Sequence, residues 1–167
     1  AIGIAHRSLL PGLITEVLHA EVELLGILQS AAAIGSLGAG LYIASMKSIP
    51  RKGALMLLVT VAYGASLLTV GWASMFWIVL PLLIVGAMSQ TVFRAANTTM
   101  LLERTPARLH GRVVSVTLVD HALSPLVGII AGLIADSRGV GAGFAFLGAS
   151  ILAVVALTMI VNPGFRK

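Results

Sequence analysis

The sequence predicts an all-α membrane protein, a bundle of six transmembrane helices. The first reason is composition: 58% of the residues are hydrophobic and only 10% are charged, whereas globular proteins carry roughly a quarter charged residues. The second reason is that apolar runs long enough to cross about 30 Å of hydrocarbon alternate with short charged turns. The chain also has no cysteine, which excludes a disulfide framework and a thiolate site.

The first half of the chain contains three expected helices. Residues 1–18 form the first, with a kink at Pro11-Gly12. Because the chain starts inside an apolar run, we expect it to be a fragment whose first helix is truncated. Residues 24–46, which carry no charge, form the second helix, and the basic turn 47–53 leads into the third.

A charge-free stretch from residue 53 to residue 93 is too long for a single crossing. The segment 71–74, with the sequence GWAS, divides this stretch into the third and fourth helices. Trp72 and Trp77 are placed like residues of an interfacial aromatic belt. A later turn at residues 136–143 precedes the sixth helix, which ends at residue 161.

The fourth and fifth helices flank a charged turn at residues 103–112, and ionisable residues lie inside both helices. Arg94 and Asp120 each lie about 13 Å from the turn, close to the middle of a bilayer core. An unpaired charge there costs roughly 2.5 to 3.5 kcal/mol. We therefore expect these two residues to pair, either as a structural clamp or as a contact that opens when Asp120 takes up a proton. Separate partners, such as His121 or another bundle, are the alternative.

Lysine and arginine in the turns predict the orientation, because cytoplasmic loops are enriched in both. Only Arg138 lies in the turns of one side. The turns and the chain end of the other side hold Lys47, Arg51, Lys52, Arg104, Arg108, Arg112, Arg166 and Lys167. We therefore expect this basic side, with both chain ends, to be cytoplasmic.

Small residues recur every four positions on two expected helices. They are Ala31, Gly35 and Ala39 on the second helix, and Ser124, Gly128 and Gly132 on the fifth. Such stripes let helix backbones approach closely in a membrane. General packing within the bundle is the plainer interpretation, and a sliding interface with another bundle is the sharper one.

Several functional classes are excluded by the residues present. The net charge of +5 comes from turns beside apolar runs, without a basic helix face, so we expect no nucleic-acid partner. The sequence contains no GxSxG motif, no phosphate loop and no histidine–carboxylate set at metal-ligand spacing. Asp120 and His121 are adjacent and point apart on a helix. We expect no catalytic residue, no metal and no cofactor.

Two stretches resemble one family of membrane proteins. They are AANTTMLLERTPARLHGRVVSVTLVDHALSPLVGIIAGLIADSRG and LLPGLITEVLHAEVELLGILQSAAAIGSLGAG. The first resembles the second half of major facilitator superfamily transporters, and the second resembles helices seven and eight of the bacterial branch of transmembrane secretion effectors and enterobactin-exporter-like proteins. The resemblance implies that residues 1–167 are helices seven to twelve of a twelve-helix fold, without the N-terminal half.

The turn of the central hairpin carries part of this resemblance, through Pro106, Gly111 and Arg112. The resemblance implies that these residues act as hinge and gate elements. Anchoring of the helix end to lipid phosphate is the alternative for Arg112. The earlier basic turn at 47–53 lacks the aspartate of the family's gating motif, so no charge relay is expected there.

The resemblance also implies that the first and fourth helices line a central cavity. Gln90, Arg94 and Asn97 fall on one face of the fourth helix, and Arg7 lies on the first, where snorkelling to the interface is its alternative. With Asp120 and His121 of the fifth helix, these residues are the expected contacts for substrate or for coupling.

The implied function is secondary active transport across the bacterial cytoplasmic membrane. The resemblance favours export of amphipathic small molecules, of drug or siderophore type, by proton antiport and alternating access. An importer of the same fold and a non-transporting six-helix scaffold are the alternatives. The implied partners are the N-terminal six-helix half, the lipid bilayer, the small-molecule substrate and the proton.

Overall fold

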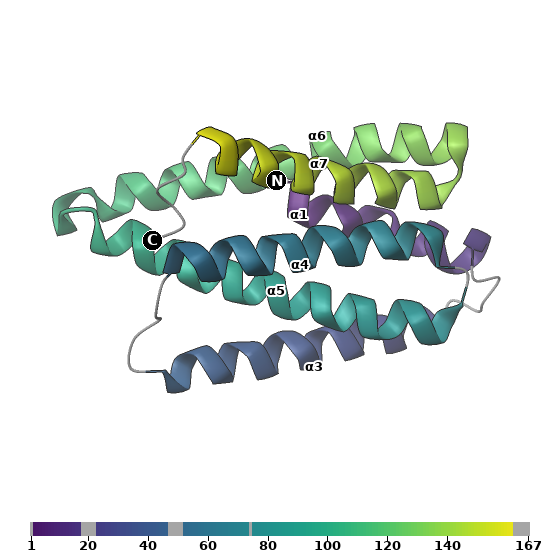
Figure 1. The fold of residues 1–167 in the computed structure, drawn as a ribbon, viewed down its shortest axis with the longest axis horizontal. Helices are drawn as coiled ribbons and strands as arrows, with labels where there is room; N and C mark the ends of the chain where they lie inside the picture. The colour runs from purple at the N-terminus through teal and green to yellow at the C-terminus, as the bar shows by residue number, and fades with distance from the viewer. Residues whose placement is uncertain (1, 18–22, 47–51, 74, 162–167) are drawn as a thin grey trace.

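The computed structural model is a bundle of long α-helices (Figure 1), and it describes residues 2–17, 23–46, 52–73 and 75–161. Within these residues five helices are long and apolar enough to cross a membrane. They are α3 (Glu23–Ser45), α4 (Lys52–Trp72), α5 (Phe76–Glu103), α6 (His110–Arg138) and α7 (Val140–Val161). The all-helical membrane class predicted from the sequence is therefore confirmed, with five of the six expected crossings present as continuous helices.

The first expected helix is broken into short pieces. It consists of α1 (Ile2–Ala5), the 3₁₀ turn η1 (His6–Ser8), α2 (Leu10–Gly12) and the π-helical turn η2 (Leu13–Val17). The break starts before the predicted kink, because the Leu9 N–H bonds the His6 carbonyl at 3.1 Å instead of continuing an α-helical ladder. We call residues 2–17 the first segment.

The long helices pack in an order that differs from their order in the sequence. Helix α3 packs on α5, α5 on α4, and α4 on α7, while α6 packs on α7 and α1. Figure 1 shows α3 on one side of the bundle and α6 with α7 on the other. Helices α5 and α6 are consecutive in the chain, yet each has its main packing partners elsewhere.

Glycines bring the backbones of α4 and α7 into direct contact. A methyl group on Gly71 would lie 2.6 Å from the carbonyl oxygen of Gly141. One on Gly148 would lie 2.6 Å from the Leu68 nitrogen and 2.7 Å from the Gly64 carbonyl oxygen. Neither site has room for a larger residue, so these glycines allow the close helix packing that is typical of membrane bundles.

The link between α6 and α7 is shorter than the sequence predicts. Residues 136–143 were expected to form a turn, but α6 continues to Arg138 and α7 begins at Val140. Gly139 alone makes the reversal, with φ at 89°, and its N–H bonds the Ala135 carbonyl at 2.8 Å. Glycine adopts this backbone conformation without steric cost, which explains the compact turn.

The predicted small-residue stripes take different places in the bundle. A methyl group on Gly35 would lie 2.8 Å from Ile84 Cγ2, so this part of α3 packs closely on α5. One on Gly128 would lie 3.2 Å from Ser8 Oγ, whereas Gly132 has open space around it. For Gly35 and Gly128 the contacts lie within the bundle, which favours the plainer interpretation of general helix packing.

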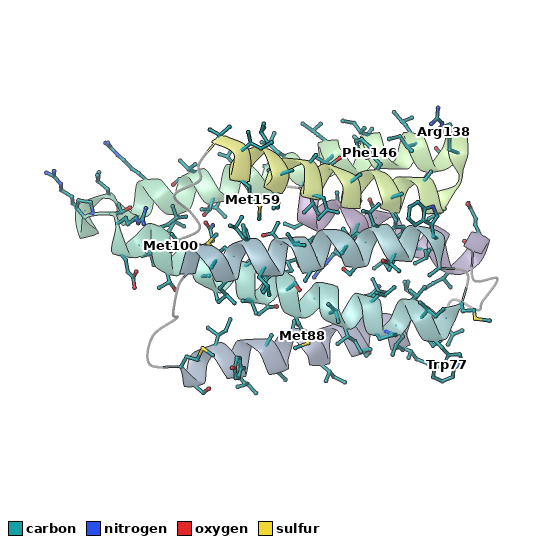
Figure 2. All side chains as sticks on the ribbon, in the orientation of Figure 1. Trp77, Met88, Met100, Arg138, Phe146 and Met159 are labelled. Atoms are coloured by element: carbon teal, nitrogen blue, oxygen red, sulfur yellow. The ribbon has the colours of Figure 1, made fainter. Side chains whose placement is uncertain are left out.

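The tryptophans lie near one end of the bundle. Trp72 ends α4, Trp77 lies in the first turn of α5, and both side chains are 81% exposed. Figure 2 shows Trp77 and Arg138 at this end, with Met100 and Met159 toward the other. This placement suits the aromatic belt that the sequence predicts at a membrane interface.

Candidate functional site

A cavity of about 430 Å³ lies between the first segment, α3, α4 and α5. Its polar lining consists of His6 and Arg7 from the first segment, Gln29 and Ser36 from α3, Tyr63 and Ser66 from α4, and Gln90, Thr91 and Arg94 from α5. The helices that carry these side chains are otherwise strongly apolar. The size falls within the range of about 300 to 1,000 Å³ that is typical of small-molecule sites.

A hydrogen bond joins two of the elements at this cavity. The Tyr63 hydroxyl and Nδ1 of His6 are 2.9 Å apart, and the two rings meet edge to face at 77° with centroids 6.0 Å apart. Tyr63 is buried. The contact holds the 3₁₀ turn of the first segment against α4, so it positions the adjacent Arg7 at the cavity.

The serine and threonine hydroxyls of the cavity donate their hydrogens to their own helices. Ser36 bonds the Ala33 carbonyl at 2.9 Å, and Ser66 bonds the Tyr63 carbonyl at 2.8 Å. Thr91 bonds its own helix in the same way, at 3.0 Å to a carbonyl one turn earlier. Such back-bonds satisfy polar groups in an apolar helix, and the hydroxyl oxygens keep lone pairs that accept further hydrogen bonds.

The charged groups of the described lining are both positive. Arg7 and Arg94 come from elements that are far apart in the sequence, and both line the same cavity as Tyr63. No aspartate or glutamate is among the described residues that line the cavity. In the described ranges there is also no group of three or more metal-ligating side chains. The site is therefore suited to recognising negative charge.

The structure brings together three of the six residues that the sequence suggests for substrate or coupling. Arg7, Gln90 and Arg94 all line the cavity. Asn97 lies one turn further along α5, is half-buried and does not line it. Asp120 and His121 belong to α6, but their side chains lie outside the described residues.

The pairing of Arg94 with Asp120 is the expectation from the sequence, and no described contact tests it, because the Asp120 side chain lies outside the described residues. The described cavity residues around Arg94 come from the first segment, α3, α4 and α5, and none comes from α6. Helix α5 has its main contacts with α3 and α4, and α6 has its main contacts with α7 and α1. This packing favours separate partners for the two charges, which was the alternative interpretation.

The proposed gate residues lie at the exposed end of the α5–α6 hairpin. Pro106 precedes the 3₁₀ turn η3 (Ala107–Leu109), and Gly111 and Arg112 lie in the first turn of α6. All three are exposed, and Gly111 has open space around it. Figure 1 shows this hairpin extending beyond the neighbouring helices. A gating role for these residues stays a prediction, and the basic turn at 47–51 lies outside the described residues.

Sequence reasoning did not select five other polar residues of the cavity, which are Gln29, Ser36, Tyr63, Ser66 and Thr91. Tyr63 and Ser66 are one turn apart on α4, and Gln29 and Ser36 are two turns apart on α3. The available signal was the spacing, since polar residues at i and i+3 or i+7 in an apolar helix share one face.

Comparison with known proteins finds a similarity along nearly the whole chain. A protein described as the staphyloferrin A transporter of Staphylococcus aureus (strain NCTC 8325 / PS 47) is 24% identical over 162 residues. The similarity covers 97% of this chain and 41% of that protein, so the chain spans about two fifths of its relative's length. No family model matches the chain, and no solved structure matches it. With five apolar helices among its described residues and this similarity, the chain is a multi-pass membrane protein.

Proposed function

We propose that this chain is the C-terminal six-helix half of a secondary transporter of the major facilitator type, located in the bacterial cytoplasmic membrane. The observation that carries the proposal is the 24% identity to the staphyloferrin A transporter over 97% of the chain. A polar cavity between apolar helices supports it, because transporters place their substrate sites between membrane helices.

In this proposal the half rocks against a second half and exposes the substrate site to each side of the membrane in turn. Arg7, Gln90 and Arg94 contact the substrate from the cavity wall. Asp120 and His121 of α6 are the proposed carriers of the coupling proton, since an ionisable group inside a membrane helix is costly unless it has a function or a partner. The direction is export, the substrate is an amphipathic molecule of siderophore type, and the coupling is proton antiport.

The test uses the complete protein that contains this chain, expressed in inside-out bacterial vesicles. We expect a proton gradient to drive saturable accumulation of the exported molecule, and an uncoupler to abolish it. Accumulation in right-side-out vesicles instead would establish an importer. The absence of gradient-driven movement in either orientation, for a correctly inserted protein, would favour the scaffold and contradict the proposal.

A matched pair of variants ties the activity to the cavity. Arg94→Gln removes a charge from the cavity wall, whereas Arg138→Gln removes one from the exposed end of α6. The first variant should lose transport and the second should retain it at equal expression. The chain alone should give no saturable flux in proteoliposomes, because alternating access needs two halves.

A further inference from the structure

We infer that the cavity binds a small organic anion through carboxylate groups, with Arg7 and Arg94 as the principal contacts. The idea that this anion is also carried across the membrane rests on the proposed function, whereas its binding does not.

The described lining of the cavity carries a net positive charge. Arg7 and Arg94 line the cavity from the first segment and from α5. None of the described lining residues is acidic. Both arginine side chains are exposed, so a small anion in the cavity can reach them and supply the negative charge that the described lining lacks.

Both positive charges belong to guanidinium groups. Arginine presents planar, parallel N–H groups that match the two oxygens of a carboxylate, which makes the pair stronger than a contact with a point charge. The two arginines come from different elements, so they are suited to two carboxylates of one molecule, or to one carboxylate held from two sides. A neutral or cationic drug gains nothing from this arrangement.

The neutral groups of the cavity narrow the chemical class of the ligand further. The hydroxyl hydrogens of Ser36, Ser66 and Thr91 are already donated within their helices, so their oxygens are left as acceptors. Ligand hydroxyl or amide hydrogens would satisfy these acceptors. Leu28 and Leu83 form apolar wall on which a short carbon skeleton can pack. A hydroxycarboxylate has the carboxylates that the arginines bind, the hydroxyl hydrogens that the acceptors need and a short carbon skeleton.

The test measures occupancy of the cavity directly. The chain has no cysteine, so Ala33→Cys places one thiol in the cavity lining, and Ser137→Cys places one at the exposed end of α6. Both variants are made in the complete protein that contains this chain, with any cysteines outside the chain replaced, and are reconstituted in nanodiscs of neutral phosphatidylcholine and labelled with a small maleimide. Citrate is the probe, with its uncharged triamide and sodium chloride of equal ionic strength as controls.

We expect citrate to slow labelling at position 33 and to leave position 137 unchanged. The triamide and sodium chloride should have no effect at either position. On the Ala33→Cys background, Arg7→Gln or Arg94→Gln should raise the half-protecting citrate concentration about tenfold or more, the loss expected for one charge-assisted hydrogen bond. Arg→Lys at either position should recover part of the protection, because the charge remains without the planar geometry.

Several outcomes would overturn the inference. Equal protection by citrate and its triamide would show that charge is not recognised, and citrate without effect on a folded chain would show that no such site exists. Protection by phosphatidylglycerol in the nanodisc that citrate cannot compete away would assign the arginines to a lipid headgroup instead. If Arg94→Gln does not fold, Arg7→Gln carries the same test.

The result is separable from the proposed function. Citrate binding that fails while the complete protein still moves a substrate along a proton gradient would contradict the anion site alone. Citrate binding that depends on both arginines, in a complete protein without any flux, would support the anion site and contradict transport.

Discussion

Nδ1 of His6 and the hydroxyl oxygen of Tyr63 lie 2.9 Å apart at the wall of the cavity. The two residues are 57 positions apart in the chain, so this contact is tertiary. It joins the 3₁₀ turn η1 to the regular helix α4. A 3₁₀ turn has poorer hydrogen-bond geometry than an α-helix, so it depends more on tertiary contacts. The position of the cavity arginine at residue 7 depends on this junction.

Removal of the Tyr63 hydroxyl should therefore weaken both the fold and the cavity. We expect Tyr63→Phe to lower the free energy of unfolding by about 0.5 to 1.5 kcal/mol, the usual net worth of one hydrogen bond. Reversible unfolding in mixed micelles measures it. Tyr42→Phe is the matched control, because Tyr42 lies on the outer face of α3 and is 65% exposed. A double-mutant cycle with His6→Ala should show a coupling of similar size, and purely additive losses would contradict the bond.

The contact between α4 and α7 should not tolerate a side chain at Gly148. A methyl group there would lie 2.6 Å from a backbone nitrogen and 2.7 Å from a backbone oxygen of α4, so the helices must separate. We expect Gly148→Ala to cost about 1 to 3 kcal/mol in the same unfolding assay, the usual penalty for overpacking. Gly38→Ala on α3 is the control: it has open space and should be neutral or stabilising by up to about 1 kcal/mol. Equal effects of the two changes would contradict the close packing.

Arg94 and Asp120 should behave as independent sites. Helices α5 and α6 have different main packing partners, so we expect the losses of expression from Arg94→Ala and Asp120→Ala to add in the double variant. The charge swap, Arg94→Asp with Asp120→Arg, should be no better than the worse single variant. Membrane-inserted protein, measured by fluorescence-detected size exclusion, is the readout. Recovery in the swap would instead establish the pair that the sequence predicted.

The two ends of α6 should lie on opposite sides of the membrane. Arg108 lies in the basic hairpin before this helix and Ser137 lies at its far end, and both are exposed. The positive-inside rule places the hairpin in the cytoplasm. With single cysteines, an impermeant maleimide on intact cells should label Ser137→Cys and should reach Arg108→Cys only after lysis. The reverse pattern would invert the orientation.

Much of the fold could be predicted because membrane-spanning helices are recognisable in a sequence as long apolar runs. The apolar lengths gave the five long helices, and the break near segment 71–74 lies where α4 ends and α5 begins. Two features escaped prediction. The first segment is broken at His6 by local hydrogen bonding, and the α6–α7 turn shrinks to Gly139, since continuing both helices satisfies more backbone groups in an apolar setting.

The cavity was only partly predictable, because the spacing of residues shows which of them share a helical face but does not show which helix packs against that face. The spacing of Gln90 and Arg94 on one face was visible, and both residues line the cavity. The contribution of Tyr63 was not, since it depends on α4 packing beside the first segment. The sequence also showed that Arg94 and Asp120 lie at similar depths in the membrane. Equal depth does not determine whether the faces of α5 and α6 that carry them are in contact.

The end of the α5–α6 hairpin is where an insertion would disturb the packing of the helices least. Residues 104–109 extend past the neighbouring helices (Figure 1), and Arg104, Pro106 and Arg108 are exposed. A fluorescent protein or an affinity tag inserted between Pro106 and Arg108 would displace no packed helix, because loop tips tolerate insertion far better than helix interiors do. An insertion at Gly139, by contrast, would change how α7 presents its glycines to α4. The hairpin can therefore hold a sensor on the same side of the membrane as the basic turns.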